Sequence, residues 1–399
     1  MLARSQILGL SFVLLLGSSA SACPLCGSAQ KTFSEDFAAA DVVVLAQWSD
    51  GKPPAGMLGR TTFSVVEVAR GEQTSLKKDA KLSVPKFHAG QRGDLFLLFG
   101  RKEDDELSWR PLEISEAGYQ YLKQAPAAEV PTAKRLEYFV KFLEFSDERI
   151  AMDAYWEFAG APWEDIVKVK GKLDRAKLQR WIKDDRTLST RLNLYFLLLG
   201  LCGNDEDART LENLVRVPPP VFSLGRDGLM SSYLLLTGDK GLKVLDETKL
   251  TNPQAPVSEV YAAMQAMQFM WTYGNDRIEQ DRLRTSMRQL LDRPEIVDLV
   301  IADLARWEDW SVQQRLMNLY GQGEYSIPSI KRAIVRYLLT AAKVQPPKVD
   351  ETKKDDPTVT KSKPDELPAS ALQARANLEK LRETDPKTVK EAERFFFLQ

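Results

Sequence analysis

The sequence predicts a multidomain α+β protein, in which a small β-barrel or sandwich is followed by an α-helical repeat or bundle domain. Three observations lead to this prediction. Short β-rich runs, divided by Gly, Pro and charged residues, occupy 29–124. From about 134 to 343 the apolar residues recur with the 3.6-residue period of a helix. At 399 residues the chain is long enough for two or three domains.

The N-terminus is typical of an export signal. A positive charge at Arg4 precedes a mostly apolar run over 7–16, which is too short to span a bilayer. Small residues then lead to Ala22. We therefore predict a signal peptide over 1–22, cleaved after Ala22, and a mature protein that is periplasmic, bound in the cell envelope or extracellular.

The segment Cys23-Pro24-Leu25-Cys26 supports several interpretations. In an oxidising compartment the two cysteines would form a structural disulfide. The small residues before Cys23 also fit a bacterial lipidation signal, and a diacylated cysteine would anchor the protein to a membrane. A Cys-x-x-Cys pair with proline resembles oxidoreductase motifs as well, in which a low thiol pKa supports thiol-disulfide exchange.

The predicted β domain covers 23–125. Its strands are expected at 42–45, 61–68, 81–84, 94–100 and 109–114, each rich in β-branched or aromatic residues and bounded by turn residues. Cell adhesion through the Arg92-Gly93-Asp94 tripeptide is not predicted, because these residues fit a turn before a strand. His88, the single histidine of the chain, falls in a predicted loop, where a solvated or hydrogen-bonded side chain is expected.

The order of these segments resembles the netrin-like OB-fold domains, best known from the tissue inhibitors of metalloproteinases. The residues that carry the resemblance are Ala40–Ala46, then Phe63, Val65, Val68, Arg70 and Gly71, and finally Gly93–Gly100. It extends over roughly a quarter of the chain and implies an OB-type barrel. In the inhibitors the amino group and carbonyl of the N-terminal cysteine chelate a protease's catalytic zinc, which implies the same role for mature Cys23.

The second domain is predicted over 134–343. Apolar stretches that end near Gly203, Gly238 and Gly274 are spaced by roughly 35 residues, and each glycine precedes Asn or Asp. This pattern resembles degenerate HEAT or armadillo repeats, and an irregular helical bundle is the alternative. A polar, Pro-rich linker is expected over 344–368, and a short helical tail over 369–399.

Composition narrows the function. With 55 basic and 56 acidic residues the net charge is -1, which disfavours a nucleic-acid partner. No second apolar stretch is long enough to span a membrane, so membrane attachment is expected only through lipidated Cys23. Cys202, in an apolar stretch, is expected to be a buried thiol. With one histidine and no catalytic motif, we predict no cofactor, no metal site and no enzymatic activity.

The sequence thus predicts an exported, non-catalytic protein-interaction or scaffold protein whose protein partner is unknown. Two alternatives remain open. One is a metalloprotease inhibitor that acts through mature Cys23. The other is an extracytoplasmic thiol-disulfide protein that uses Cys23 and Cys26.

Overall fold

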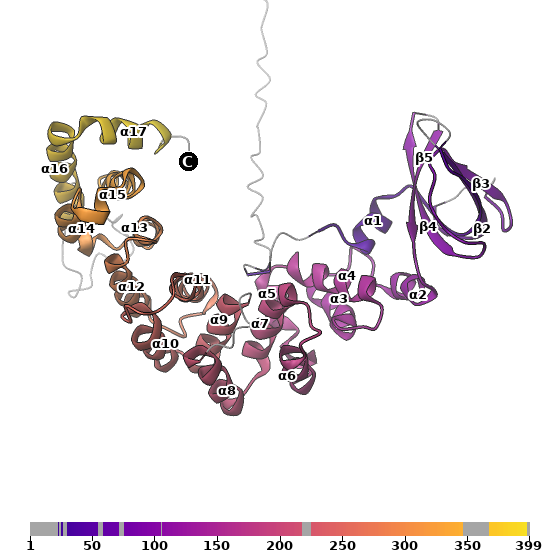
Figure 1. Ribbon diagram of the computed structural model, residues 1–399, viewed down its shortest axis with the longest axis horizontal. Helices are drawn as coiled ribbons and strands as arrows, with labels where there is room; N and C mark the ends of the chain where they lie inside the picture. The colour runs from indigo at the N-terminus through magenta and orange to yellow at the C-terminus, as the bar shows by residue number, and fades with distance from the viewer. Residues whose placement is uncertain are drawn as a thin grey trace, which may run out of the picture. The chain divides into compact units, whose positions relative to one another are not determined.

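The computed structural model describes residues 23, 25–26, 30–54, 59–71, 76–104, 106–217, 225–345 and 367–396. The chain divides into two compact units, of which the first ends at Lys172 and the second begins at Leu173. The fold is α+β, with the sheet in the first unit and helices in both (Figure 1). The predicted signal peptide with Ala22, most of the predicted linker and the last three residues of the tail lie outside the described residues.

The first unit contains a five-stranded antiparallel sheet. In chain order the strands are β1 (Val42–Lys52), β2 (Arg60–Arg70), β3 (Lys81–Val84), β4 (Leu95–Glu103) and β5 (Glu106–Glu113). The order across the sheet is β3-β2-β1-β4-β5. All five overlap the predicted strands. The sequence predicted a barrel or sandwich, whereas the strands form an open sheet with β3 and β5 at its edges.

The apolar run at 42–46 occupies the centre of the sheet because both faces of β1 are covered. Val42, Val44 and Ala46 point into one apolar cluster, together with Phe63 and Leu98 from neighbouring strands. The residues between them point into a second cluster on the other face. A strand buried on both faces is expected to be apolar throughout rather than alternating.

Two helices cover this second face. They are α1 (Phe33–Ala39), which begins at a Thr32 capping box, and α2 (Glu116–Gln124), which is capped by Ser115. Phe37 of α1 and both Tyr119 and Leu122 of α2 pack against the sheet. The first unit continues with α3 (Thr132–Phe139), α4 (Glu148–Ala159) and α5 (Trp163–Lys168).

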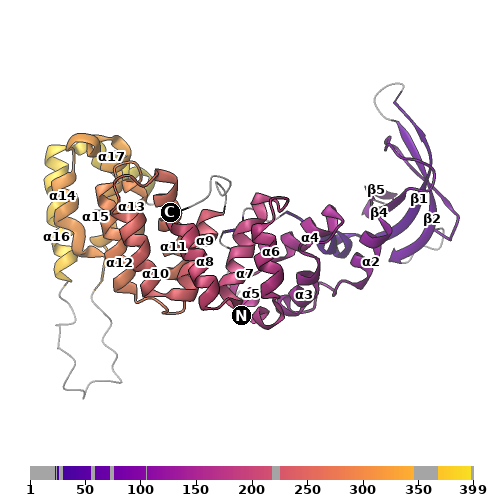
Figure 2. The same ribbon diagram turned by 60° about the horizontal axis from the view of Figure 1, so that its bottom comes forward.

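The second unit is helical throughout the part that the structure describes. Figure 1 shows α7, α9, α11, α13 and α15 following one another in one layer of the second unit, with α8, α10, α12 and α14 in a second layer along its outer side; Figure 2 shows the same helices in a turned view. The bounds are α6 (Arg175–Lys183), α7 (Leu192–Cys202), α8 (Asp205–Arg216), α9 (Arg226–Thr237), α10 (Asp239–Leu245), α11 (Val257–Tyr273), α12 (Gln280–Gln289), α13 (Val297–Arg306), α14 (Gln313–Leu319), α15 (Pro328–Ala341), α16 (Ala369–Thr384) and α17 (Pro386–Phe396).

Helix ends follow the predicted glycine positions. Helices α7, α9 and α11 end directly before Gly203, Gly238 and Gly274. The side chain of Asn204 then caps α8. Within the described ranges, no helix combines the length and the apolar character needed to cross a membrane.

Buried ion pairs connect successive helices of the second unit. Glu259 of α11 accepts hydrogen bonds from Lys249 at 2.5 Å and from Arg226 of α9 at 2.9 Å. Arg288 of α12 pairs with buried Asp309 at 2.6 Å. Because a buried charge without a partner is strongly unfavourable, these contacts restrict how neighbouring helices can pack.

Candidate functional site

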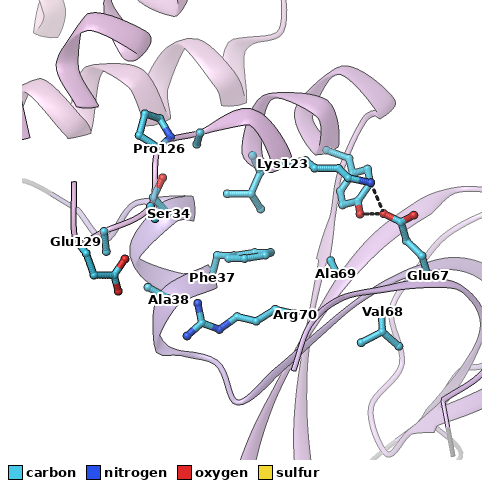
Figure 3. Close-up of a pocket in the computed structure, with 15 residues that line it drawn as sticks. Ser34, Phe37, Ala38, Glu67, Val68, Ala69, Arg70, Lys123, Pro126 and Glu129 are labelled. Carbon is cyan, nitrogen blue, oxygen red and sulfur yellow. Dashed lines mark hydrogen bonds and ion pairs between the residues drawn. The ribbon is translucent and has the colours of Figure 1, made fainter. Parts of the chain in front are cut away.

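A pocket of about 380 Å³ lies in the first unit, where β2 meets α1, α2 and the segment after α2 (Figure 3). Phe37, Ala69 and Leu122 contribute apolar surface, and the segment 125–129 forms the wall opposite β2. A volume of this size is within the usual range of ligand pockets. Apolar surface, charged side chains and an incompletely paired strand meet at this pocket.

One wall of the pocket is an incompletely paired strand. Strand β3 pairs only with the first half of β2, from Thr61 to Ser64. The backbone of Val65 still bonds to the segment before β3, through Ala80 and Asp79. From Glu67 to Arg70, the outer edge of β2 has no strand partner among the described residues. We call this stretch the free edge of β2.

The free edge is irregular. The register between β1 and β2 shifts three times, and two of these shifts leave Val66 and Ala69 without an opposite residue in β1. Such bulges bend a strand and increase its twist. Strand β2 ends at Arg70, and Gly71 follows with a φ of +78°, a conformation that favours glycine.

A hydrogen-bonded network joins the free edge to α2. Glu67 accepts hydrogen bonds from the Tyr119 hydroxyl and from Lys123 Nζ, the latter at 3.0 Å. These two bonds lower the pKa of Glu67, while burial and the bond to Glu67 raise the pKa of Tyr119. At neutral pH the carboxylate therefore stays charged and the phenol stays protonated. The network holds α2 against β2 and, with these pKa directions, does not provide a proton-transfer group near neutral pH.

Opposite charges stand near the mouth of the pocket. The Arg70 guanidinium lies 5.9 Å from the centroid of the Phe37 ring. In Figure 3 the Arg70 side chain extends toward Ala38, and the Glu129 carboxylate lies on that same side of the view. Arg70 and Glu129 are both exposed. A ligand that enters the pocket thus meets one positive group, one negative group and the apolar surface of Phe37.

Two buried carboxylates of α4 position the α1 wall. Asp153 accepts the Phe33 N–H at 2.6 Å and the Tyr121 hydroxyl at 2.8 Å. Glu157 accepts the Thr32 hydroxyl at 2.7 Å and Arg135 Nη2 at 2.6 Å. Negative charge at the start of α1 is favourable because the N–H groups there lack partners within the helix.

Burial dominates the titration of this pair. It raises the pKa of Asp153 to about 7, against the opposing effect of the Phe33 and Tyr121 hydrogen bonds. Burial also raises the pKa of Glu157, with Arg135 opposing it. The seating of α1, and with it one wall of the pocket, therefore includes a group that titrates near neutral pH.

The predicted cysteine residues lie away from the pocket lining. Cys23 and Cys26 form a disulfide, and 5 % and 1 % of their surfaces are exposed. The Cys23 N–H donates to the carbonyl of Ala159 at 3.1 Å, so this segment packs on the end of α4. This arrangement favours a structural role, because inhibition through Cys23 requires its amino group and carbonyl to be exposed to a metal.

The remaining predicted residues are likewise held in place by the fold. Cys202, expected to be buried, is only partly so, and burial raises its thiol pKa to about 11. His88 lies in the loop after β3. Its backbone N–H donates to the Thr61 hydroxyl and its backbone carbonyl accepts from the Trp48 indole. The expectation of a solvated or hydrogen-bonded side chain is not met, because Nε2 of the imidazole is buried and has no hydrogen-bond partner among the described residues.

Sequence reasoning missed the residues that form the site. Asp153 and Glu157 could have been found, since they are spaced i, i+4 in the otherwise largely apolar stretch 150–159. For Glu67, Tyr119 and Lys123 no local signal exists, because β2 and α2 are far apart in the sequence.

Within the described ranges, no group of three or more His, Cys, Asp or Glu side chains is arranged to hold a metal ion. In comparisons with known proteins, no family model, no curated protein and no solved structure matches the chain.

Proposed function

We propose that the protein is an exported, non-catalytic interaction protein that binds an extended segment of a partner protein by adding it as a strand to the free edge of β2. The observation that carries the proposal is the coincidence of this edge with the 380 Å³ pocket. Unpaired peptide groups at a sheet edge are a template for another strand, and an adjoining pocket selects the side chains of that strand.

The chemistry of the pocket suggests what the segment contains. Side chains of a bound strand point alternately toward and away from the pocket wall. A side chain that points inward would meet Phe37 and Leu122, whereas flanking residues would meet Arg70 and Glu129. We infer that the preferred segment carries an apolar residue with an acidic and a basic residue near it.

In this proposal the Cys23–Cys26 disulfide anchors the mature N-terminus against the end of α4. Export through the 1–22 signal, the netrin-like character of the sheet and the HEAT-like character of the helices remain predictions of the sequence. Metalloprotease inhibition and thiol-disulfide exchange remain predictions as well, and the burial of both cysteines favours neither.

The test is peptide selection with a pocket-filling control. Random peptides are displayed and selected on the full-length protein, and their affinities are measured again on Ala128→Trp, which places an indole at the exposed wall of the pocket. The matched control is Ala376→Trp, at an exposed position of α16. We expect binders to lose affinity about tenfold or more on Ala128→Trp only, because a filled pocket cannot accept their apolar side chain.

Hydrogen exchange gives the second readout. A peptide added as a strand slows amide exchange between Glu67 and Arg70, since its carbonyls accept edge N–H groups. Selected peptides that bind Ala128→Trp as well as the wild type, or that leave this stretch unprotected, would contradict the proposal.

A further inference from the structure

A hollow of about 570 Å³ lies in the second unit, between α13 and α15. These two helices are neighbours in one layer of the unit (Figure 1). Three arginines line the hollow: Arg306 from α13, and Arg332 and Arg336 from α15. Among the lining residues the single acid is Asp298. We call this hollow the arginine groove.

The arginines are only partly neutralised. Arg306 contacts Asp303, which lies below the surface, yet 69 % of the Arg306 side chain is exposed. Arg332 contacts Glu391 of α17 at 3.3 Å. Arg336 forms no ion pair with the residues that the structure describes. Both walls of the arginine groove therefore present positive charge to solvent.

Apolar surface runs between the charged groups. Leu299 is 45 % exposed, and Ala302, Ala305 and Ala333 also line the groove. A groove bordered by guanidinium groups and floored by small apolar side chains is complementary to a segment that carries carboxylates and one apolar face.

We propose that the arginine groove binds an acidic amphipathic segment of a partner protein, with its apolar residues on Leu299 and its carboxylates on Arg306 and Arg336. Charge complementarity selects this occupant. Guanidinium groups pair with carboxylates through two parallel hydrogen bonds, and the opposed walls allow contacts on both sides of one segment. Nucleic acid is less suitable, because among the lining residues only Tyr337 has a ring and it is 1 % exposed. The inference does not depend on the free edge of β2.

The experiment measures binding of a fluorescent peptide to the full-length protein by anisotropy at low salt. The probe is a peptide of about twelve residues with Leu on one helical face and Glu on the other. A peptide with Lys in place of every Glu serves as the ligand control. We expect the Glu peptide to bind, the Lys peptide to bind at least about tenfold more weakly, and added salt to weaken the Glu complex.

Matched variants separate the effect of charges in the arginine groove from the effect of the protein's net charge. Arg306→Glu with Arg336→Glu reverses two charges of the groove, and Arg180→Glu with Arg209→Glu makes the same charge change at exposed positions of α6 and α8. We expect at least about a tenfold loss of affinity for the first pair and less than about twofold for the second. Arg336→Gln alone should give an intermediate loss, and it keeps the test valid if the first double variant fails to fold.

Three results would overturn the inference. The first is a wild type that does not bind the Glu peptide under these conditions, and the second is an equal loss of affinity in both double variants. Tighter groove-dependent binding of single-stranded DNA than of the Glu peptide would assign the groove to nucleic acid instead.

Discussion

Replacement of Asp153 by Asn should remove most of the pH dependence of α1 docking. The pKa of Asp153 is raised from 3.8 to about 7, mainly by burial. A difference of roughly three pKa units corresponds to about 4 kcal/mol, at about 1.4 kcal/mol per unit. The amide of Asn can still accept the Phe33 N–H and donate to the Tyr121 oxygen, so the variant removes the ionisation and keeps the packing.

The direction in which stability changes with pH follows from the number of protons that each state binds. Because the pKa of Asp153 is higher in the folded state than in the unfolded chain, the folded state binds more protons between about pH 4 and pH 7. Stability of the contacts between α1 and α4 therefore falls as the pH rises through this range, and it levels off above it. The pKa of Glu157 is raised as well, which leaves a smaller slope of the same sign in the variant.

Amide hydrogen exchange, resolved by mass spectrometry and corrected for the intrinsic rate at each pH, measures this local stability in the full-length chain. For the wild type we expect protection of α1 and α4 to decline from pH 4.5 to 7.5, and for Asp153→Asn a much flatter profile. Asp50→Asn, at an exposed position of β1, is the control and should retain the wild-type slope. Equal slopes in the wild type and Asp153→Asn would refute the assigned titration.

Three further predictions concern other parts of the chain. Gly71 has a φ of +78°, and a Cβ added there would lie 2.3 Å from the carbonyl oxygen of Asp41. Gly71→Ala should therefore lower the free energy of unfolding, measured by urea titration, by about 2 kcal/mol or more. Gly93→Ala, which places its Cβ in open space, should lower it by about 1 kcal/mol. Glu259→Gln should destabilise the second unit by about 3 kcal/mol, because Lys249 stays buried without its charge partner. A double variant in which Glu259 and Lys249 both become Leu should recover part of this loss of stability in melting experiments. A double variant no more stable than Glu259→Gln would contradict the ion-pair argument. Cys202 should react slowly with iodoacetamide at pH 8 in the native protein and rapidly in urea, as judged by mass spectrometry; equal rates would contradict its raised pKa.

Local sequence patterns predicted the individual strands and helix ends well, but they did not predict whether the strands close into a barrel. The apolar run at 42–45 identified the central strand, and the glycines at 203, 238 and 274 marked helix ends. Whether five short strands close into a barrel depends on their shear and on long-range pairing, which no local pattern encodes. Strand β3 has only four residues, and a strand that short leaves much of β2 without a partner on that side.

The candidate site was less predictable for a related reason. Its residues come together through contacts between distant segments, such as Glu67 with Tyr119. The unpaired backbone of β2 also belongs to the site, and unpaired backbone has no side-chain signature in the sequence. Cys23 and Cys26 attracted attention because cysteine chemistry is recognisable from sequence, yet the structure buries both residues.

The free edge of β2 also bears on solubility. An exposed strand edge can pair with the same edge of a second copy, which is a common first step toward aggregation. Here the bulges at Val66 and Ala69 interrupt the straight hydrogen-bonding line that two identical edges need, and the exposed charge of Arg70 would face its own copy in many antiparallel pairings. If the free edge binds a partner strand as proposed, its bends favour a strand of matching shape over the same edge of a second copy.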